Sequence, residues 1–104
     1  MDKNKKAIIE MTVSMIYNCH DNLEIDVISD EKTMNGKSGV YIKIKWMGMV
    51  KEEFITFRFC EDMLLWGQLL VKEYINTIFR NDITRIVKME KRKEIIKKVI
   101  KWKK

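Results

Sequence analysis

The amino-acid sequence predicts an α+β fold: an antiparallel sheet of four strands, or five if residues 83–89 are a strand, packed against one long helix, with a basic amphipathic helix at the C-terminus. Apolar and polar residues alternate over residues 9–19 and 23–27 and again over residues 40–47 and 54–59, which is the period of strands with one buried face. Over residues 61–79 the apolar residues recur at helical spacing instead. The length of 104 residues predicts a single domain, residues 1–104.

The first two predicted strands form a hairpin. From Ile9 to Cys19 the odd positions are apolar, and the same alternation resumes over residues 23–27. A loop at residues 20–22 would keep apolar side chains opposite one another, and its Asn22 tolerates the left-handed backbone that such loops need. We therefore expect a β-hairpin over residues 9–27.

Two further strands are predicted at residues 40–47 and 54–59, close enough in sequence to form a second hairpin. The polar residues 29–39 precede them and contain Asn35-Gly36, a strong turn signal. We expect these residues to form a mobile, turn-rich loop.

The predicted helix over residues 61–79 begins with acidic residues, where the helix dipole favours negative charge, and should lie across the sheet. Residues 81–82 should end it. Residues 83–89 then form a strand or a helical turn, a break falls near residue 90, and residues 93–103 form a three-turn amphipathic helix. We expect the apolar stripe of that last helix to dock on the body of the protein or on a second subunit.

Positive charge is concentrated at the end of the chain. Residues 83–104, the basic C-terminal segment, carry ten Lys/Arg and two Glu, a net charge of +8. The residues before them carry eleven Lys/Arg and thirteen Asp/Glu, a net charge of −2. Clustered cations attract polyanions and gain free energy by releasing counterions, so this segment predicts a phosphate-bearing partner.

The composition indicates where the protein acts. No uninterrupted apolar run approaches the roughly 18 residues of a membrane span, and the N-terminal residues do not read as a secretory signal. We therefore expect a cytoplasmic protein without a transmembrane segment. The chain has no proline, and its seventeen lysines outnumber four arginines, a bias that is typical of AT-rich genomes and fits a phage, a plasmid or an AT-rich bacterium.

The sequence carries no catalytic or metal-binding motif. Its soft metal ligands are Cys19, His20 and Cys60, and their spacing does not resemble paired CxxC motifs. A single histidine without a placed base gives no arrangement that would activate a nucleophile. We expect a protein that is not an enzyme, has no cofactor and holds no metal.

The outward face of the second predicted hairpin combines basic and aromatic residues. In the predicted pairing Ile44 faces Phe57, so Lys43 faces Arg58 on the other side of the sheet, next to Tyr41. Single-stranded nucleic acid needs cations for its phosphates and rings on which bases stack, at about 1–3 kcal/mol per base. The pattern therefore indicates a nucleic-acid-binding face.

An alternative explanation of the lysines on this face needs no ligand. Glu24 and Asp26 should point outward from the neighbouring strand. Cross-strand pairing with Lys43 and Lys45 would then account for both positive charges.

The segment VYIKIKWMGMVKEEFITFRFCEDMLLWGQLL has a basic strand, a second strand and a helix that carries Trp66. Over residues 40–79 it resembles the positive-cofactor-four family of single-strand-binding coactivators. The resemblance implies a dimer whose strands grip unpaired DNA. The residues that it implies for this contact are Tyr41, Lys43, Lys45 and Arg58.

A winged helix-turn-helix is the competing prediction, and it implies duplex DNA. The helix over residues 61–79, a turn at residues 80–82 and a helix from Ile83 would form the motif, with residues 29–39 as the tip of the wing. The choice between duplex and single-stranded DNA stays open at this stage.

Together these observations predict a non-enzymatic DNA-binding accessory or regulatory protein of a mobile genetic element, acting as a homodimer or another small oligomer. Two alternatives stay open: an inhibitor that binds a host protein, and a protein that binds a membrane surface through its basic helix. The residues expected to contact nucleic acid are Tyr41, Lys43, Lys45, Arg58, Arg85, Lys88, Lys91, Arg92, Lys93 and Lys37.

Overall fold

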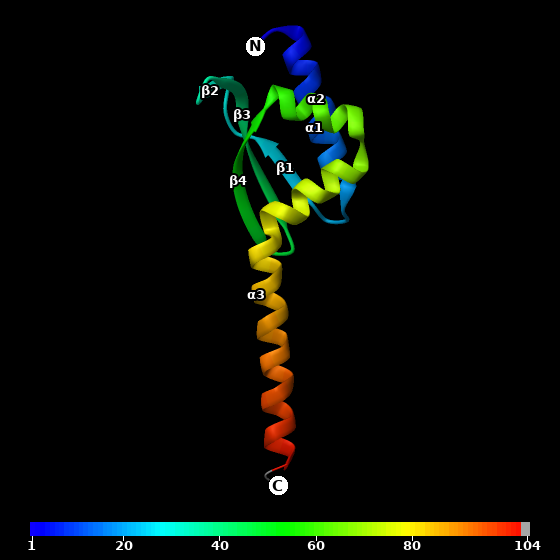
Figure 1. The fold of residues 1–104 in the computed structure, drawn as a ribbon, viewed down its shortest axis with the longest axis vertical. Coiled ribbons are helices and arrows are strands. Elements are labelled where there is room, and N and C mark those ends of the chain that lie inside the picture. Colours follow the sequence, from blue (N-terminus) through cyan, green and yellow to red (C-terminus); the bar gives the residue numbers. More distant parts are fainter. Residues whose placement is uncertain (103–104) are drawn as a thin grey trace.

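The computed structural model describes the backbone of residues 1–102 and the side chains of residues 1–85. This part of the chain forms an α+β fold, as predicted, with three helices and a four-stranded antiparallel sheet (Figure 1). In chain order the elements are α1 (Lys3–Cys19), β1 (Glu24–Val27), β2 (Lys32–Met34), β3 (Lys37–Trp46), β4 (Met49–Thr56), α2 (Phe57–Trp66) and α3 (Gln68–Trp102).

Strand β3 is the centre of the sheet. Strand β4 pairs along one edge of β3. Strands β1 and β2 pair with two successive parts of the other edge of β3. Between them, the Ile28 N–H donates to the Tyr41 carbonyl at 2.9 Å and the Ser29 hydroxyl accepts from the Tyr41 N–H at 2.8 Å. The hydroxyl thus takes the place of a strand carbonyl, so the edge of β3 stays hydrogen-bonded where β1 and β2 are interrupted.

Two tight turns fix the strand register. Asn35-Gly36 joins β2 to β3 and Met47-Gly48 joins β3 to β4, each with positive φ at both residues. This is the backbone of a type I′ turn, whose twist matches that of the strands it joins. Residues 32–34 and 37–39 are therefore part of the sheet, so the prediction of one loop over residues 29–39 was wrong there, whereas residues 29–31 and 35–36 lie outside the strands as predicted.

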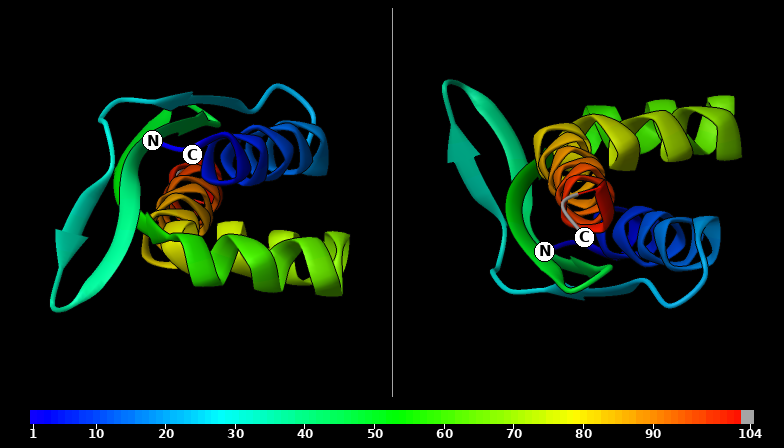
Figure 2. Two further views of the ribbon diagram at one scale, coloured as in Figure 1. Left: turned by 90° about the horizontal axis from the view of Figure 1, so that it is seen from above. Right: turned by 90° about the horizontal axis from the view of Figure 1, so that it is seen from below.

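The core lies between the sheet and the helices. Val40, Ile42 and Ile44 of β3 are fully buried, and Figure 2 shows all three helices on the inner side of the curved sheet. The helices contribute Ile16 from α1 and Met63 from α2. The buried residues that α3 contributes are Val71, Ile75 and Phe79.

The first predicted strand is a helix, and the predicted hairpin over residues 9–27 does not form. The Asp2 carboxylate accepts from the Lys5 N–H at 2.7 Å and caps α1. The buried residues of α1 are Ile9, Thr12, Ile16 and Cys19, spaced at three and four, so one helical face accounts for burial. The odd-numbered apolar positions were misleading because two of them, Met11 and Tyr17, are exposed.

The fourth strand ends earlier than predicted. The Thr56 hydroxyl accepts from the Phe59 N–H at 3.1 Å, so Thr56 caps α2 and residues 57–59 are helical. Strand β4 therefore spans residues 49–56, and Ile44 lies opposite Lys51 and not opposite Phe57. The predicted pairing of Lys43 with Arg58 was wrong for the same reason.

The predicted helix over residues 61–79 is two helices. Gly67 interrupts it with φ of 75°, and the Gly67 N–H closes α2 by donating to the Met63 carbonyl at 2.8 Å. Helix α3 then passes through residues 81–82 without ending. There, Asp82 forms an ion pair with Lys51 of β4 at 2.9 Å and Ile83 packs against the core.

Beyond these contacts α3 leaves the domain. Its C-terminal half extends past the sheet and the other helices (Figure 1), and the molecule is 68 Å long against 25 and 19 Å in the other directions. Residues 83–89 are helical and not a strand, the backbone has no break near residue 90, and residues 93–102 continue α3 in place of a separate helix. The predicted docking of the last apolar stripe concerns side chains outside the described residues.

Changing Gly39 to Ala should destabilise the fold strongly. A Cβ there would lie against the Ile55 carbonyl and within 2.8 Å of the Thr56 Cα, both backbone atoms of β4, so the strands would have to move apart. We expect a loss of about 3 kcal/mol in the free energy of unfolding, measured with urea. The matched control is Gly48→Ala, which meets no atom within 4 Å but keeps a positive φ, and should cost only about 1 kcal/mol. Equal costs would contradict the tight β3–β4 approach.

Candidate nucleic-acid interface

The predicted basic face of the sheet is flanked by acidic residues. Lys43 and Lys45 alternate with the buried residues of β3 and so point away from the helices. Asp26 and Glu52 lie on either side of Lys43, and Glu24 lies beside Lys45. The register places Glu24 and Asp26 opposite these lysines, as the cross-strand alternative requires. With three carboxylates around two ammonium groups, this face attracts a polyanion only weakly.

The aromatic residues of the same face pack against one another. The rings of Tyr41 and Phe54, which are cross-strand neighbours, have centroids 5.1 Å apart and are tilted by 56°. This is a favourable aromatic geometry, and both residues are partly buried. Their faces are therefore only partly available for stacking with bases.

A hollow of about 510 Å³ opens at the other end of β3, where the start of α2 and the N-terminal part of α1 meet the sheet. It brings together two predicted site residues, Lys37 of β3 and Arg58 of α2, that are far apart in sequence. Because Arg58 lies in the first turn of α2, it is beside this hollow and not on the sheet face. The lining residues are Lys5, Lys37, Ser38, Thr56, Phe57, Arg58, Phe59 and Asp62.

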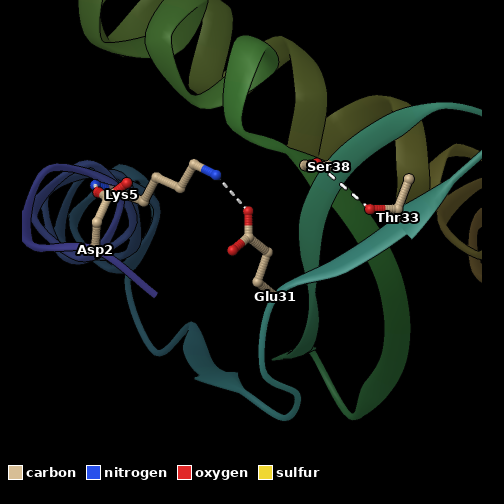
Figure 3. A network of polar contacts seen from close by, with 5 residues as sticks. All are labelled: Asp2, Lys5, Glu31, Thr33 and Ser38. Carbon is tan, nitrogen blue, oxygen red and sulfur yellow. Dashed lines mark hydrogen bonds and ion pairs between the residues drawn. The ribbon is translucent and has the colours of Figure 1, made fainter.

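Lys5 is the lining cation that sequence reasoning missed, because it lies on a helix that was not predicted. Its ammonium forms an ion pair with Glu31, which reaches across from the connection between β1 and β2 (Figure 3), and it lies 5.2 Å from the centroid of the Phe57 ring. The hydrogen bond with Glu31 raises the pKa of Lys5. Lys5 therefore links α1 to the sheet edge, and its charge is already balanced.

The remaining cations of the hollow are free. Within residues 1–85, neither Lys37 nor Arg58 forms an ion pair, and both side chains are exposed. The Thr56 hydroxyl already accepts a hydrogen bond from an N–H group at the N-terminus of α2. The positive potential of the hollow therefore comes mainly from the side chains of Lys37 and Arg58. Asp62 offsets part of it. The hollow is thus suited to one phosphate-sized anion and not to a long polyanion.

The basic C-terminal segment, residues 83–104, lies elsewhere. Arg85 is exposed on α3, two residues after Ile83, which packs against the core. The backbone of the other predicted tail residues is helical, and their side chains lie outside the described residues. Figure 1 shows this half of α3 at the opposite end of the molecule from the N-terminal end of α1. Those other tail residues are Lys88, Lys91, Arg92 and Lys93.

Both cysteines are buried, and the single histidine packs against a tryptophan ring. Burial raises the pKa of Cys60 to about 11, which a hydrogen bond with Thr12 partly opposes, and burial also raises the pKa of Cys19. His20 stacks on Trp46 with ring centroids 4.5 Å apart. Among the described residues, no group of three His, Cys, Asp or Glu side chains could hold a metal ion. In the same part of the chain no helix combines the length and apolar character needed to cross a membrane.

Comparisons with known proteins do not assign the chain to a family. It matches no model of a known protein family, no curated protein and no solved structure. The resemblance to the positive-cofactor-four family stays a prediction, and the function has to be argued from charge and geometry.

Cys60 should react only in the unfolded protein. With a pKa of about 11, its thiolate fraction at pH 8 is about one in a thousand, so alkylation by iodoacetamide should be slow until urea unfolds the chain. The raised pKa also makes stability depend on pH. The folded state holds the Cys60 proton more tightly than the unfolded state, so this contribution is complete below pH 9 and disappears as the pH rises towards 11.

The size of this alkaline loss is on the order of 2 kcal/mol. Urea unfolding at pH 8 and pH 10.5 measures it, and Cys60→Ala is the control, since the substitution removes the titrating group. The same loss of stability in Cys60→Ala would show that another group, such as the buried Tyr74, is responsible.

Proposed function

We propose that this protein is a non-enzymatic DNA-binding accessory or regulatory protein that contacts phosphates through the basic C-terminal segment. The observation that carries the proposal is the separation of charge along the chain. Residues 83–104 have a net charge of +8, and all the residues before them together have a net charge of −2. A binding free energy from counterion release scales with the number of phosphates that such a segment neutralises.

The course of α3 supports this proposal. Residues 83–102 continue a helix that extends beyond the domain, which holds most of the acidic residues. Twenty helical residues span about 30 Å, a length over which duplex DNA presents phosphates on both sides of a groove. We call residues 83–102, the part of α3 that extends beyond the domain, the cationic arm. Its cations can approach DNA without bringing the acidic surface of the sheet close to the DNA.

The hollow at Lys37 and Arg58 is a second, smaller contact in this proposal. Both side chains are without ion-pair partners in the described residues, but they lie at the end of the domain away from the arm. The two sites would therefore meet different phosphates. The outward face of the sheet contributes little, because Lys43 and Lys45 are balanced by their acidic neighbours.

The proposal of a non-enzymatic role is supported by the state of the nucleophiles and bases. Burial keeps Cys60 protonated at neutral pH, and His20 lies against an indole ring. The lysine-rich, proline-free composition supports an origin in a phage or a plasmid. In this proposal the protein acts by binding DNA and does not catalyse a reaction.

Removing charge from the arm should abolish most of the DNA affinity. We expect binding of the unmodified protein to a 20-base-pair duplex to weaken with salt at a log–log slope near −4, as about four to five phosphate contacts require. A variant with glutamine at residues 85, 88, 91, 92 and 93 should lower the slope to about half or less. Fluorescence anisotropy between 50 and 300 mM NaCl measures both, and a single-stranded oligonucleotide of the same length decides which form is preferred.

The matched control is Lys43→Gln with Lys45→Gln, which removes two charges from the sheet face and should leave the slope unchanged. Binding that does not depend on salt, or no binding to either oligonucleotide at 50 mM NaCl, would overturn the proposal. A control variant that weakens binding as much as the arm variant would move the interface to the sheet.

Charge removal at the hollow should have a smaller and separate effect. Lys37→Gln with Arg58→Gln removes at most two phosphate contacts, so the slope should become less steep by about one to two. Because the hollow and the arm are at opposite ends of the molecule, the effects of the two sets of substitutions should add. Anisotropy with the combined variant tests this, and strong non-additivity would mean that both sets affect one contact.

A further inference from the structure

Three large apolar residues are exposed together where α2 meets α3. Leu65 is 77% exposed, Trp66 is 71% exposed and Leu69 is 84% exposed. We call these three residues the elbow patch. All three belong to the helix predicted over residues 61–79, and the interruption at Gly67 separates Leu65 and Trp66 on α2 from Leu69 on α3. Single exposed apolar residues are ordinary, but three that adjoin at one corner, including a tryptophan, are typical of an interaction surface.

The elbow patch is held in a fixed shape. The Gly67 N–H donates to the Met63 carbonyl at 2.8 Å, and the Gly67 carbonyl accepts from the Val71 N–H at 3.3 Å. The Gln68 side chain donates to the Met15 carbonyl of α1 at 3.4 Å, which joins the start of α3 to α1. A surface ordered in advance loses little entropy when a partner covers it.

We propose that a second copy of this chain covers the elbow patch in a two-fold symmetric dimer. The charges at the rim of the patch favour this occupant. Glu61 lies one turn before Leu65 on α2, Lys72 lies one turn after Leu69 on α3 beside Glu73, and all three are exposed. A two-fold axis near Trp66 would set Glu61 of each copy against Lys72 of the other, and opposite charges would meet twice.

The area of the patch is consistent with this role. A tryptophan and two leucines at these exposures present roughly 400 Å² of side-chain surface. The patch thus supplies about half of the roughly 800 Å² per partner of a standard interface, and the charged residues at its rim add to this area. A membrane or a nucleic acid fits less well, since the rim carries both signs of charge and no excess of cations.

The dimer has a consequence for the arms and does not depend on DNA binding. Helix α3 begins at the elbow patch, so the interface would join two α3 helices near their starts and give each dimer two cationic arms. Two arms that reach one DNA molecule would bind it with a higher effective concentration than either arm alone. If DNA binding fails while dimerisation holds, only the proposed function is wrong.

Sedimentation equilibrium of the full chain, between 2 and 200 μM, tests the dimer. We expect a mass that rises with concentration to twice the 12.5 kDa of one chain. Leu65→Ser with Leu69→Ser should weaken the dimer at least 100-fold. The control is Tyr17→Ser with Val50→Ser, at residues that are 58% and 51% exposed away from the patch, and it should dimerise like the unmodified chain. Circular dichroism shows that each variant is folded.

Charge exchange at the rim makes the test specific for two-fold symmetry. Glu61→Lys alone and Lys72→Glu alone should each weaken the dimer about 5- to 10-fold, because each brings two like charges together, and the double exchange should restore it. A chain that stays monomeric at 200 μM, a dimer that survives the loss of Leu65 and Leu69, or a double exchange without recovery would each overturn the proposal. Binding of a monomer to vesicles containing phosphatidylserine through Trp66 would also overturn it.

Discussion

The burial of strand β3 on its inner face, with hydrogen-bonded strands on both of its edges, determines most of this structure. Val40, Ile42 and Ile44 are completely buried, and β4, β1 and β2 occupy the two edges. Because side chains alternate along a strand, the residues that point to the outer face of the sheet are then determined as well. Once the apolar residues point inward, Lys43 has to point outward between the outward residues of both neighbours, which are Asp26 and Glu52. The packing of the core thus makes the outer face of the sheet nearly neutral, which is why the proposed phosphate contacts are assigned to other parts of the chain.

The second constraint is the interruption at Gly67. It turns the chain by the positive φ that glycine adopts without strain, and this turn lets the first part of α3 reach the core while α2 packs on α1. The same turn has two further results. It exposes Leu65, Trp66 and Leu69 at the corner, and it directs the continuation of α3 out of the domain after the ion pair of Asp82 with Lys51. One glycine therefore places both the proposed dimer surface and the cationic arm.

Local patterns predicted the parts of the fold in which one period dominates. The alternation over residues 40–46 correctly predicted β3, since every second residue is buried there. Over α1 the same alternation coexists with a helical spacing, and the folded protein distinguishes them by burying the polar Thr12 and exposing the apolar Met11 and Tyr17. At residues 57–59 two phenylalanines alternate as in a strand, but the hydroxyl of Thr56 caps a helix that begins there. Competition between periods is resolved by capping and tertiary packing, which a short sequence window does not contain.

The site residues follow the same division. The outward orientation of Lys43 and Lys45 follows from β3 alone and could be predicted from the sequence. The proximity of Lys37 and Arg58 at the hollow could not be predicted from the sequence. It requires the β2–β3 turn, the end of β4 and the start of α2 to be in place together. Lys5 depended on the unpredicted helix as well. Long-range juxtapositions of this kind come from topology and leave no local signal in the sequence.

The cationic arm places stability and binding in opposition. Helix α3 extends past the sheet beyond residue 83, and its sequence there includes lysines four residues apart, such as Lys93 with Lys97 and Lys97 with Lys101, a spacing at which like charges on a helix repel by a few tenths of a kcal/mol per pair. The helix dipole offsets this only in the last turn, where cations are favoured. An anion that neutralises these charges removes the repulsion, so it stabilises the helix in the same step in which it binds. Stability of the domain alone gives no reason for so much like charge on one helix, whereas binding to a phosphate backbone does.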